Sequence, residues 1–375
     1  MQPCARASHC ADDLRIHCIF IGSLRAHYAG AVTLFTADPL VNASRAAQAA
    51  AADIQSYLRR QRVVTRLVPK DLGVPIPDVF PRRRIIFVRF ILYALACTAG
   101  EYDACLACDF KDILFQSDPF ASASLLWRSA RQPALIVGME HTHAEEARGE
   151  HNEIGRSPIN SRWVMACYGR PDRVPPPDPR WPELRDWSKC YGTAALAQVS
   201  RRPVLNDGAL LGTPAAFGAL RRLFAHNLHR AALGCRWKLW IACGDQGVFN
   251  YAVHTRAREL ANVEIQLQPT GSAGGSFGVL YRQALRHWEL PQRMAASGGY
   301  VLNDDGARTP LVHMWDRFPT KYWKNFTALV DAEAHATLEK GRARSARARE
   351  TRADAGLARM KRRARTATEV QHPLG

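Results

Sequence analysis

The stretch DACLACDFKDILFQSDPF, residues 103–120, indicates how this chain folds. Its apolar opening, residues 104–107, is typical of a buried strand, and Asp109 and Asp112 follow where that strand ends. In an open α/β sheet the loops at the carboxyl ends of strands converge on a crevice, where ligands bind. Two carboxylates three residues apart there can supply oxygens to one divalent cation, which usually keeps positions for substrate phosphates.

A plainer interpretation of the same pair stays open at this point. Asp109 can cap a helix and Asp112 can be a solvated loop charge, and a bare pair of carboxylates does not decide between a metal site and that alternative. The residues that follow, Phe115-Gln116 and Asp118-Pro119-Phe120, favour a site once the rest of the chain is considered. Asp118 itself is expected to be a turn residue ahead of proline.

The segments on both sides of this stretch predict alternating strands and helices. Strands are expected at residues 15–22, 31–36, 63–68, 134–137 and 263–267, and a further short strand is expected to end within 310–317. Helices are expected at 42–61, 84–98, 122–130, 214–230 and 321–339, and another helix is expected to begin within 244–250. A strand, helix, strand order favours a parallel sheet with right-handed crossovers. The predicted fold class is therefore α/β, with a Rossmann-like mixed but mainly parallel sheet flanked by helices.

Polar side chains recur at the ends of the later elements. Asn206-Asp207-Gly208 splits two apolar runs and predicts a turn that presents polar groups to a crevice, although it can also be a plain turn. Asp245 lies in the first turn of a predicted helix, where a negative charge is favoured, and Gln246 and Asn250 share one face of it. His313 and Arg317 lie close together where a short strand ends.

Length and composition permit one large α/β domain or two ordinary ones. The chain has 375 residues, 47% of them hydrophobic, which excludes a wholly disordered protein. Much of the formal charge of +17 is local, because residues 340–365 hold eleven Lys or Arg against two acidic residues, a net charge of +9. We predict an N-terminal extension (1–14), one large domain (15–339) and a basic tail (340–375) that forms a solvated helix or a disordered arm and can contact anionic surfaces.

The ten cysteines show no spacing typical of a zinc site. Cys105 and Cys108 are interpreted as small core residues, and the pairs Cys167 with Cys190 or Cys235 with Cys243 can form disulfides in an oxidising compartment. His141 and His143 precede two glutamates but lie in a run without helical or strand pattern, which favours a solvated loop over a metal site.

No apolar run reaches the length of a membrane span, and the first fifteen residues lack a signal-peptide core. The expected protein is soluble. It works in the cytosol, or in the Golgi or secretory lumen if an N-terminal anchor is missing from this sequence.

Taken together and in order, these motifs resemble the nucleotide-diphospho-sugar transferases of GT-A fold, especially the glycogenin-like and plant-type members. The resemblance covers residues 15–325. It departs from the family pattern at Lys111, where many relatives carry Arg, and at Asp207, where relatives often have a small residue.

The resemblance implies a glycosyltransferase that uses a nucleotide-sugar donor, Mn²⁺ or Mg²⁺, and a glycan, protein or small-molecule acceptor. It implies metal ligation by Asp112, Asp109 and His313, donor contacts by Asp109, Lys111, Asn206, Gly208, Asn250 and Arg317, and catalytic roles for Asp207, Asp245 and Gln246. Carboxylate oxygens with one imidazole suit manganese. Among the candidate catalytic residues, Asp245 and Gln246 are expected beside the donor sugar and Asp207 is a candidate base.

Two other classes of protein remain as alternatives. One is a non-catalytic binding protein, either a sugar-nucleotide binder or a nucleic-acid binder that uses the basic tail, for which salt-sensitive binding lost with residues 340–375 is diagnostic. The other is a metal-dependent phosphoesterase, which needs more carboxylate and histidine ligands than this sequence places.

Overall fold

The computed structural model describes eleven parts of the chain: residues 11–36, 45–69, 72, 81–100, 102–110, 112–121, 133–142, 152–167, 193–233, 245–279 and 299–315. Lys111, Arg317, Cys190, the helices predicted at 122–130 and 321–339, and the basic tail lie outside the described residues. The division of the chain at residues 14 and 339 therefore stays a prediction.

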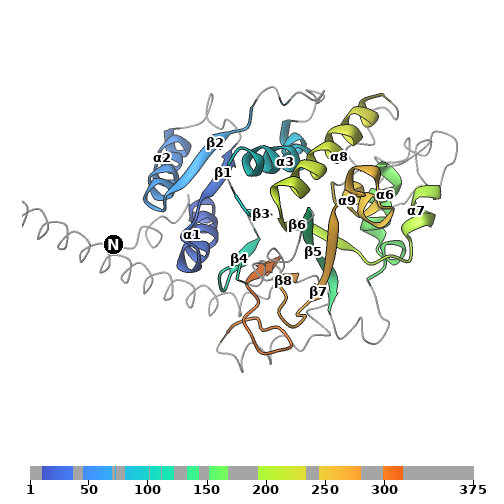
Figure 1. Ribbon diagram of the computed structural model, residues 1–375. Coiled ribbons are helices and arrows are strands. Elements are labelled where there is room, and N and C mark those ends of the chain that lie inside the picture. Colours follow the sequence, from blue (N-terminus) through green and yellow to red (C-terminus); the bar gives the residue numbers. More distant parts are fainter. Residues whose placement is uncertain are drawn as a thin grey trace, which may run out of the picture.

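The strands form three sheets (Figure 1). The largest has the order β3 (Cys105–Cys108), β6 (Leu205–Gly212), β5 (Ala134–Thr142), β7 (Glu264–Thr270). A second has the order β4 (Ile113–Phe115), β9 (Leu311–His313), β8 (Phe277–Val279). The third pairs β1 (Val32–Thr36) with β2 (Val63–Leu67).

The prediction of a mixed α/β fold is confirmed, but the expected parallel majority is not. Among the described strands three pairings are parallel, β1 with β2, β5 with β7 and β8 with β9. Three are antiparallel, because β6 runs against both β3 and β5, and β4 runs against β9. The predicted strand, helix, strand order does give the parallel β1 and β2 pair.

The largest sheet is buried on both faces, as the alternation along β6 shows. Leu210 packs in one core with side chains of α3 (Pro81–Thr98), α8 (Pro214–Leu233) and α9 (Asp245–His254). Leu211 packs in the other core with side chains of α1 (Ala11–His27), α2 (Arg45–Arg60) and β4. Successive side chains of a strand point to opposite faces, and every residue of β6 is buried, as expected for a central strand covered on both faces.

Four further helices lie within the described residues: η1 (Ile154–Arg156), α6 (Pro158–Cys167), α7 (Thr193–Val199) and η4 (Arg258–Leu260). Of these, α6 and α7 lie beside α9 (Figure 1), and η4 packs against α8. Among the described helices, none is long and apolar enough to cross a membrane.

Residues 15–22 correct one prediction, because they belong to the helix α1 and not to a strand. The apolar run is too short to distinguish a strand from a buried helix by its pattern. In the helix, Ile21 and Leu24 are buried, and they share a core with Ile113 and Phe115 of β4. Tertiary burial of this face therefore decides the helical conformation.

Arg25, in the last turn of α1, bonds to backbone carbonyls just beyond the ends of α1 and α2. Its guanidinium donates to the carbonyl oxygens of Gln61 (2.8 Å), Arg62 (3.0 Å), Gly30 (2.6 Å) and Tyr28 (3.2 Å). The last carbonyls of a helix lack intrahelical donors, and a cation is favoured beside them.

Cys105 corrects a second prediction, because it forms a disulfide with Cys97 rather than serving as a plain core residue. Cys97 lies in the last turn of α3, which packs beside the start of β3, and the two Cα atoms are 6.1 Å apart. Cys108 remains a free thiol. Each of the other two expected disulfides has at least one cysteine outside the described residues.

Candidate functional site

Three predicted metal ligands converge at the junction of two sheets. Asp109 follows β3, Asp112 precedes β4, and His313 ends β9, and one ligand atom of each lies within 4.8 Å of the others. The Nε2 atom of His313 is 3.3 Å from Oδ1 of Asp112 and 4.0 Å from Oδ2 of Asp109. The register of β4 and β9 brings this about, because Ile113 pairs with His313 and places Asp112 beside it.

The chemistry of this group fits a divalent cation. Both ring nitrogens of His313 are buried without a hydrogen-bond partner among the described residues, and two carboxylates face one of them. Burial would lower the pKa of His313, but the nearby carboxylates of Asp112 and Asp109 raise it above its ordinary value. A metal cation can take the place of the proton that this arrangement attracts, because histidine binds a metal as the neutral imidazole.

Gly208 leaves the space that the His313 ring occupies. A Cβ atom at this position would meet Cε1 of His313, lie 2.6 Å from its Nε2 and lie 3.0 Å from Oδ2 of Asp109. The carbonyl oxygen of Gly208 also accepts a hydrogen bond of 2.6 Å from the backbone N–H of Asp109. Gly208 thus lets the backbone of β6 come close to His313 and Asp109. The sequence alone does not reveal this role of the glycine.

Residues 206–208 correct the prediction of a turn, because they lie inside the strand β6. The strand pairs with β3 over residues 209–212, and with β5 at Leu205 and over 210–212 across a register shift. Within the triplet, the N–H of Gly208 donates to Oδ1 of Asn206, and its carbonyl accepts from the N–H of Asp109. The polar side chains of Asn206 and Asp207 are tolerated because distant residues provide partners for them.

Arg89 of α3 gathers three of the predicted acidic residues, and sequence reasoning missed it. Its guanidinium forms ion pairs with Asp109, with Asp207 at 3.0 Å and with Asp245 at 2.7 Å. The Arg89 side chain is only 12% exposed. A single arginine in an apolar helix usually extends to solvent, so the only signal for this role is its position on the face that meets the sheet.

Burial and charge set the protonation of this cluster. Burial raises the pKa of Asp207 and raises that of Asp245 well above its usual range, while Arg89 acts in the opposite direction on both. Burial would lower the pKa of Arg89, but the charges of Asp109, Asp245 and Asp207 raise it well above its ordinary value. The guanidinium therefore stays charged and compensates carboxylates that would otherwise bind protons.

A second polar network lies beside Asp245 and involves side-chain amides. Gln246, at the start of α9, donates from Nε2 to Oε1 of Glu140 (2.9 Å) and to Oδ1 of Asn160 (3.0 Å). Asn206 donates from Nδ2 to the same oxygen of Glu140 (3.2 Å). Glu140 of β5 and Asn160 of α6 are further residues that the sequence pattern did not indicate.

Asn250 is placed differently from the other predicted residues. Its amide exchanges two hydrogen bonds of 2.8 Å with the backbone N–H and carbonyl of Leu205, and it also donates to the carbonyl of Gln246. These contacts attach α9 to the start of β6. Gln116, part of the motif after the acidic pair, similarly bonds the backbones of Val301 and Thr309.

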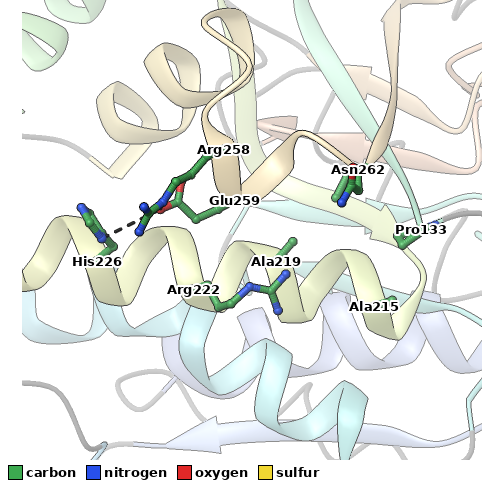
Figure 2. Close-up of a pocket in the computed structure, with 9 residues that line it drawn as sticks. Pro133, Ala215, Ala219, Arg222, His226, Arg258, Glu259 and Asn262 are labelled. Carbon is green, nitrogen blue, oxygen red and sulfur yellow. Dashed lines mark ion pairs between the residues drawn. The ribbon is translucent and has the colours of Figure 1, made fainter.

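A surface pocket lies elsewhere on the molecule (Figure 2). It has a volume of about 360 Å³ and lies between α8, which contributes Arg222 and His226, and the turn that carries Arg258 and Glu259. None of the predicted site residues lines it. The ionisable groups that converge around Arg89 and His313 identify the candidate site better than this hollow does.

Comparisons with known proteins add little to this geometry. No protein-family model matches the chain, and no curated protein matches it. Among solved structures, the apo form of mouse xyloside xylosyltransferase 1 is similar over 82% of this chain and 94% of that chain, with 13% sequence identity and a TM-score of 0.38. Because the sequence identity and the TM-score are both low, the activity is argued from the residues of this chain.

Proposed function

We propose that this protein is a metal-dependent glycosyltransferase that moves a sugar from a nucleotide-diphosphate donor to an acceptor. The observation that carries the proposal is the convergence of Asp109, Asp112 and His313, with Asp207, Asp245 and Gln246 gathered beside them. These residues come from the connection between β3 and β4 and from β6, β9 and α9. Their sequence motifs resemble those of GT-A sugar-nucleotide transferases, and their grouping supports the proposal.

Asp109, Asp112 and His313 would hold Mn²⁺ or Mg²⁺, which suits two carboxylates and an imidazole. When bound, the cation supplies Lewis-acid stabilisation of the diphosphate leaving group. Gly208 keeps space for the His313 ring, and Arg89 pairs with Oδ1 of Asp109 while the imidazole faces Oδ2. The chain itself therefore orients the ligand set.

The other predicted residues would act on the sugar and the acceptor. Asp245 and Gln246 begin α9 beside Arg89 and Glu140, where they can orient the donor sugar and stabilise positive charge that develops on it. Asp207 is the candidate base for an acceptor hydroxyl, since burial raises its pKa toward the range useful for proton transfer. Lys111 and Arg317 would add positive charge near the diphosphate.

The test is turnover of a panel of nucleotide sugars with Mn²⁺, Mg²⁺ or a chelator, followed by detection of released nucleotide and transferred sugar. We expect one donor to be consumed only with metal, and Asp112→Asn to lose at least about 100-fold in kcat/KM. Asp53→Asn, on the exposed surface of α2, is the matched control and should be unchanged.

Three results would contradict the proposal. If Asp112→Asn turns over the donor as fast as the wild type, Asp112 is not a ligand of a catalytic metal. Metal-dependent nucleotide binding without turnover would favour a binding protein. Hydrolysis of a simple phosphate ester without sugar transfer would favour a phosphoesterase.

A further inference from the structure

Glu140 is a buried carboxylate whose contacts go beyond what the proposed function uses. It lies in β5 and is 8% exposed. One of its oxygens, Oε1, accepts hydrogen bonds from Nε2 of Gln246 and from Nδ2 of Asn206. An ionised carboxylate is an acceptor only, so it discriminates between the two ends of a side-chain amide.

The Glu140 carboxylate fixes the orientation of the Gln246 amide, because it accepts a hydrogen bond from the NH₂ end of the amide. Its NH₂ group has two hydrogens, and two acceptors, Glu140 and Asn160, lie at 2.9 and 3.0 Å from its nitrogen. A reversed amide would place its carbonyl oxygen against the Glu140 carboxylate and lose both bonds. No hydrogen bond to Oε1 of Gln246 occurs among the described residues, so this oxygen is left for another partner.

The same carboxylate also fixes Asn206. Because Nδ2 of Asn206 donates to Glu140, its Oδ1 is turned to the backbone, where it accepts a hydrogen bond of 2.9 Å from the N–H of Gly208. Gly208 is the residue that makes room for the ring of His313. Glu140 therefore connects the amide of Gln246 to the strand that borders the metal ligands.

We infer that Glu140, assisted by Asn160, is a positioning residue that presents the carbonyl oxygen of Gln246, and not its NH₂ group, to the donor sugar. The inference rests on the proposed function. A carbonyl oxygen carries the partial negative charge that stabilises a developing positive centre, whereas an NH₂ group would repel it. Held by two hydrogen bonds, the amide is oriented before substrate binds, so no reorganisation is needed during the reaction.

The test compares Glu140→Met, which removes the acceptor, with Glu140→Gln, which keeps an acceptor oxygen in a side chain of the same shape. With the donor that the wild type turns over, we expect Glu140→Met to lower kcat roughly 10- to 100-fold, because misplacement by about 1 Å can cost this much. The KM for the donor and the metal-dependent binding of its nucleotide should change little. Glu140→Gln should recover much of the rate.

Asn160→Ala provides a second route to the same result if Glu140→Met folds poorly. It removes one of the two acceptors of Gln246 and should lower kcat in the same direction. When Asn160→Ala is combined with Glu140→Met, the fold loss of kcat in the double variant should be less than the product of the two single losses, because both substitutions act on one amide. Glu264→Met, at the exposed start of β7, is the matched control.

The outcomes separate the inference from the proposed function. A wild type that turns over no donor would overturn the proposed function and the inference with it. An active wild type with unchanged kcat in Glu140→Met and Asn160→Ala would overturn the inference alone. Equal losses of kcat and of nucleotide binding, without recovery in Glu140→Gln, would show a structural role instead.

Discussion

His313 shows at the scale of single residues how the candidate metal site is built. The imidazole is buried, and its Nε2 atom faces Asp112 and Asp109 only because residue 208 has no side chain. The sequence motif identifies His313 and the two carboxylates. It does not reveal the space that the His313 ring needs. That space exists because the backbone at Gly208, from a distant part of the chain, has no side chain there.

Gly208→Ala tests that space. We expect the new methyl group to displace the His313 ring and to weaken Mn²⁺ affinity by at least about tenfold, since loss of ligand orientation typically costs 10- to 100-fold. The φ angle of Gly208 is not positive, so backbone strain is not the cause. Gly218→Ala, where the nearest atom is 3.8 Å away, should bind Mn²⁺ normally. Calorimetric titration with Mn²⁺ measures both, and equal affinities would contradict the account.

Arg89→Met tests the charge balance of the cluster. Removing the guanidinium leaves Asp207 and Asp245 buried without their counter-charge, which should cost roughly 3–5 kcal/mol in the free energy of unfolding at neutral pH. Both carboxyl pKa values are already raised by burial, so the loss should shrink as pH falls and the carboxylates bind protons. Urea unfolding at pH 7 and pH 5 measures this. A loss that grows at acid pH would contradict it.

At the scale of elements, the sequence predicts most helices and strands but misassigns residues 206–208, residues 15–22 and His141, which belongs to β5 and not to a loop. The Asn-Asp-Gly triplet has the composition of a turn, yet it lies within β6, whose flanking residues pair with β3 and β5, and Arg89 and Glu140 contact its side chains. The apolar run at residues 15–22 has the composition of a strand, yet it is buried as one face of α1. Local composition cannot reveal partners that are distant in sequence.

The end of α9 gives a prediction about pH and stability. His254 donates to the carbonyl of Pro203 (2.8 Å), just before β6, and burial lowers its pKa from 6.5 to about 4. Between these two pH values the unfolded chain binds a proton that the folded chain does not, so stability falls as pH drops from 6.5 toward 4. The loss is on the order of 2–3 kcal/mol.

His254→Gln keeps a donor for the Pro203 carbonyl but removes the titration. We expect its free energy of unfolding to depend less on pH than that of the wild type between pH 6.5 and 4, with similar stability at neutral pH. Urea unfolding of both proteins across this range is the measurement. The same dependence in both would show that other groups cause it.

At the scale of the whole molecule, the disulfide of Cys97 and Cys105 ties the helix that carries Arg89 to the strand that leads to Asp109. Its two cysteines are eight residues apart, for which loop closure predicts a contribution of about 2–3 kcal/mol. The double variant Cys97→Ala, Cys105→Ala should unfold at correspondingly lower urea concentration. A wild type whose stability is unaffected by reductant would contradict this contribution.

The candidate site as a whole could be predicted only in part. The motif pattern identifies Asp109, Asp112 and His313, and the structure brings them together. Arg89, Glu140 and Asn160 carry no motif, because their role follows from which faces of α3, β5 and α6 meet the sheet. Such contacts are set by packing, so they become visible only in three dimensions.

The most direct test of the central claim is calorimetric titration of the protein with a panel of nucleoside diphosphates, with and without Mn²⁺. We predict that at least one nucleoside diphosphate binds in the presence of Mn²⁺, that chelation abolishes this binding, and that Asp112→Asn loses it while remaining folded. Binding that is independent of metal for every nucleotide, or that Asp112→Asn leaves unchanged, would contradict the claim.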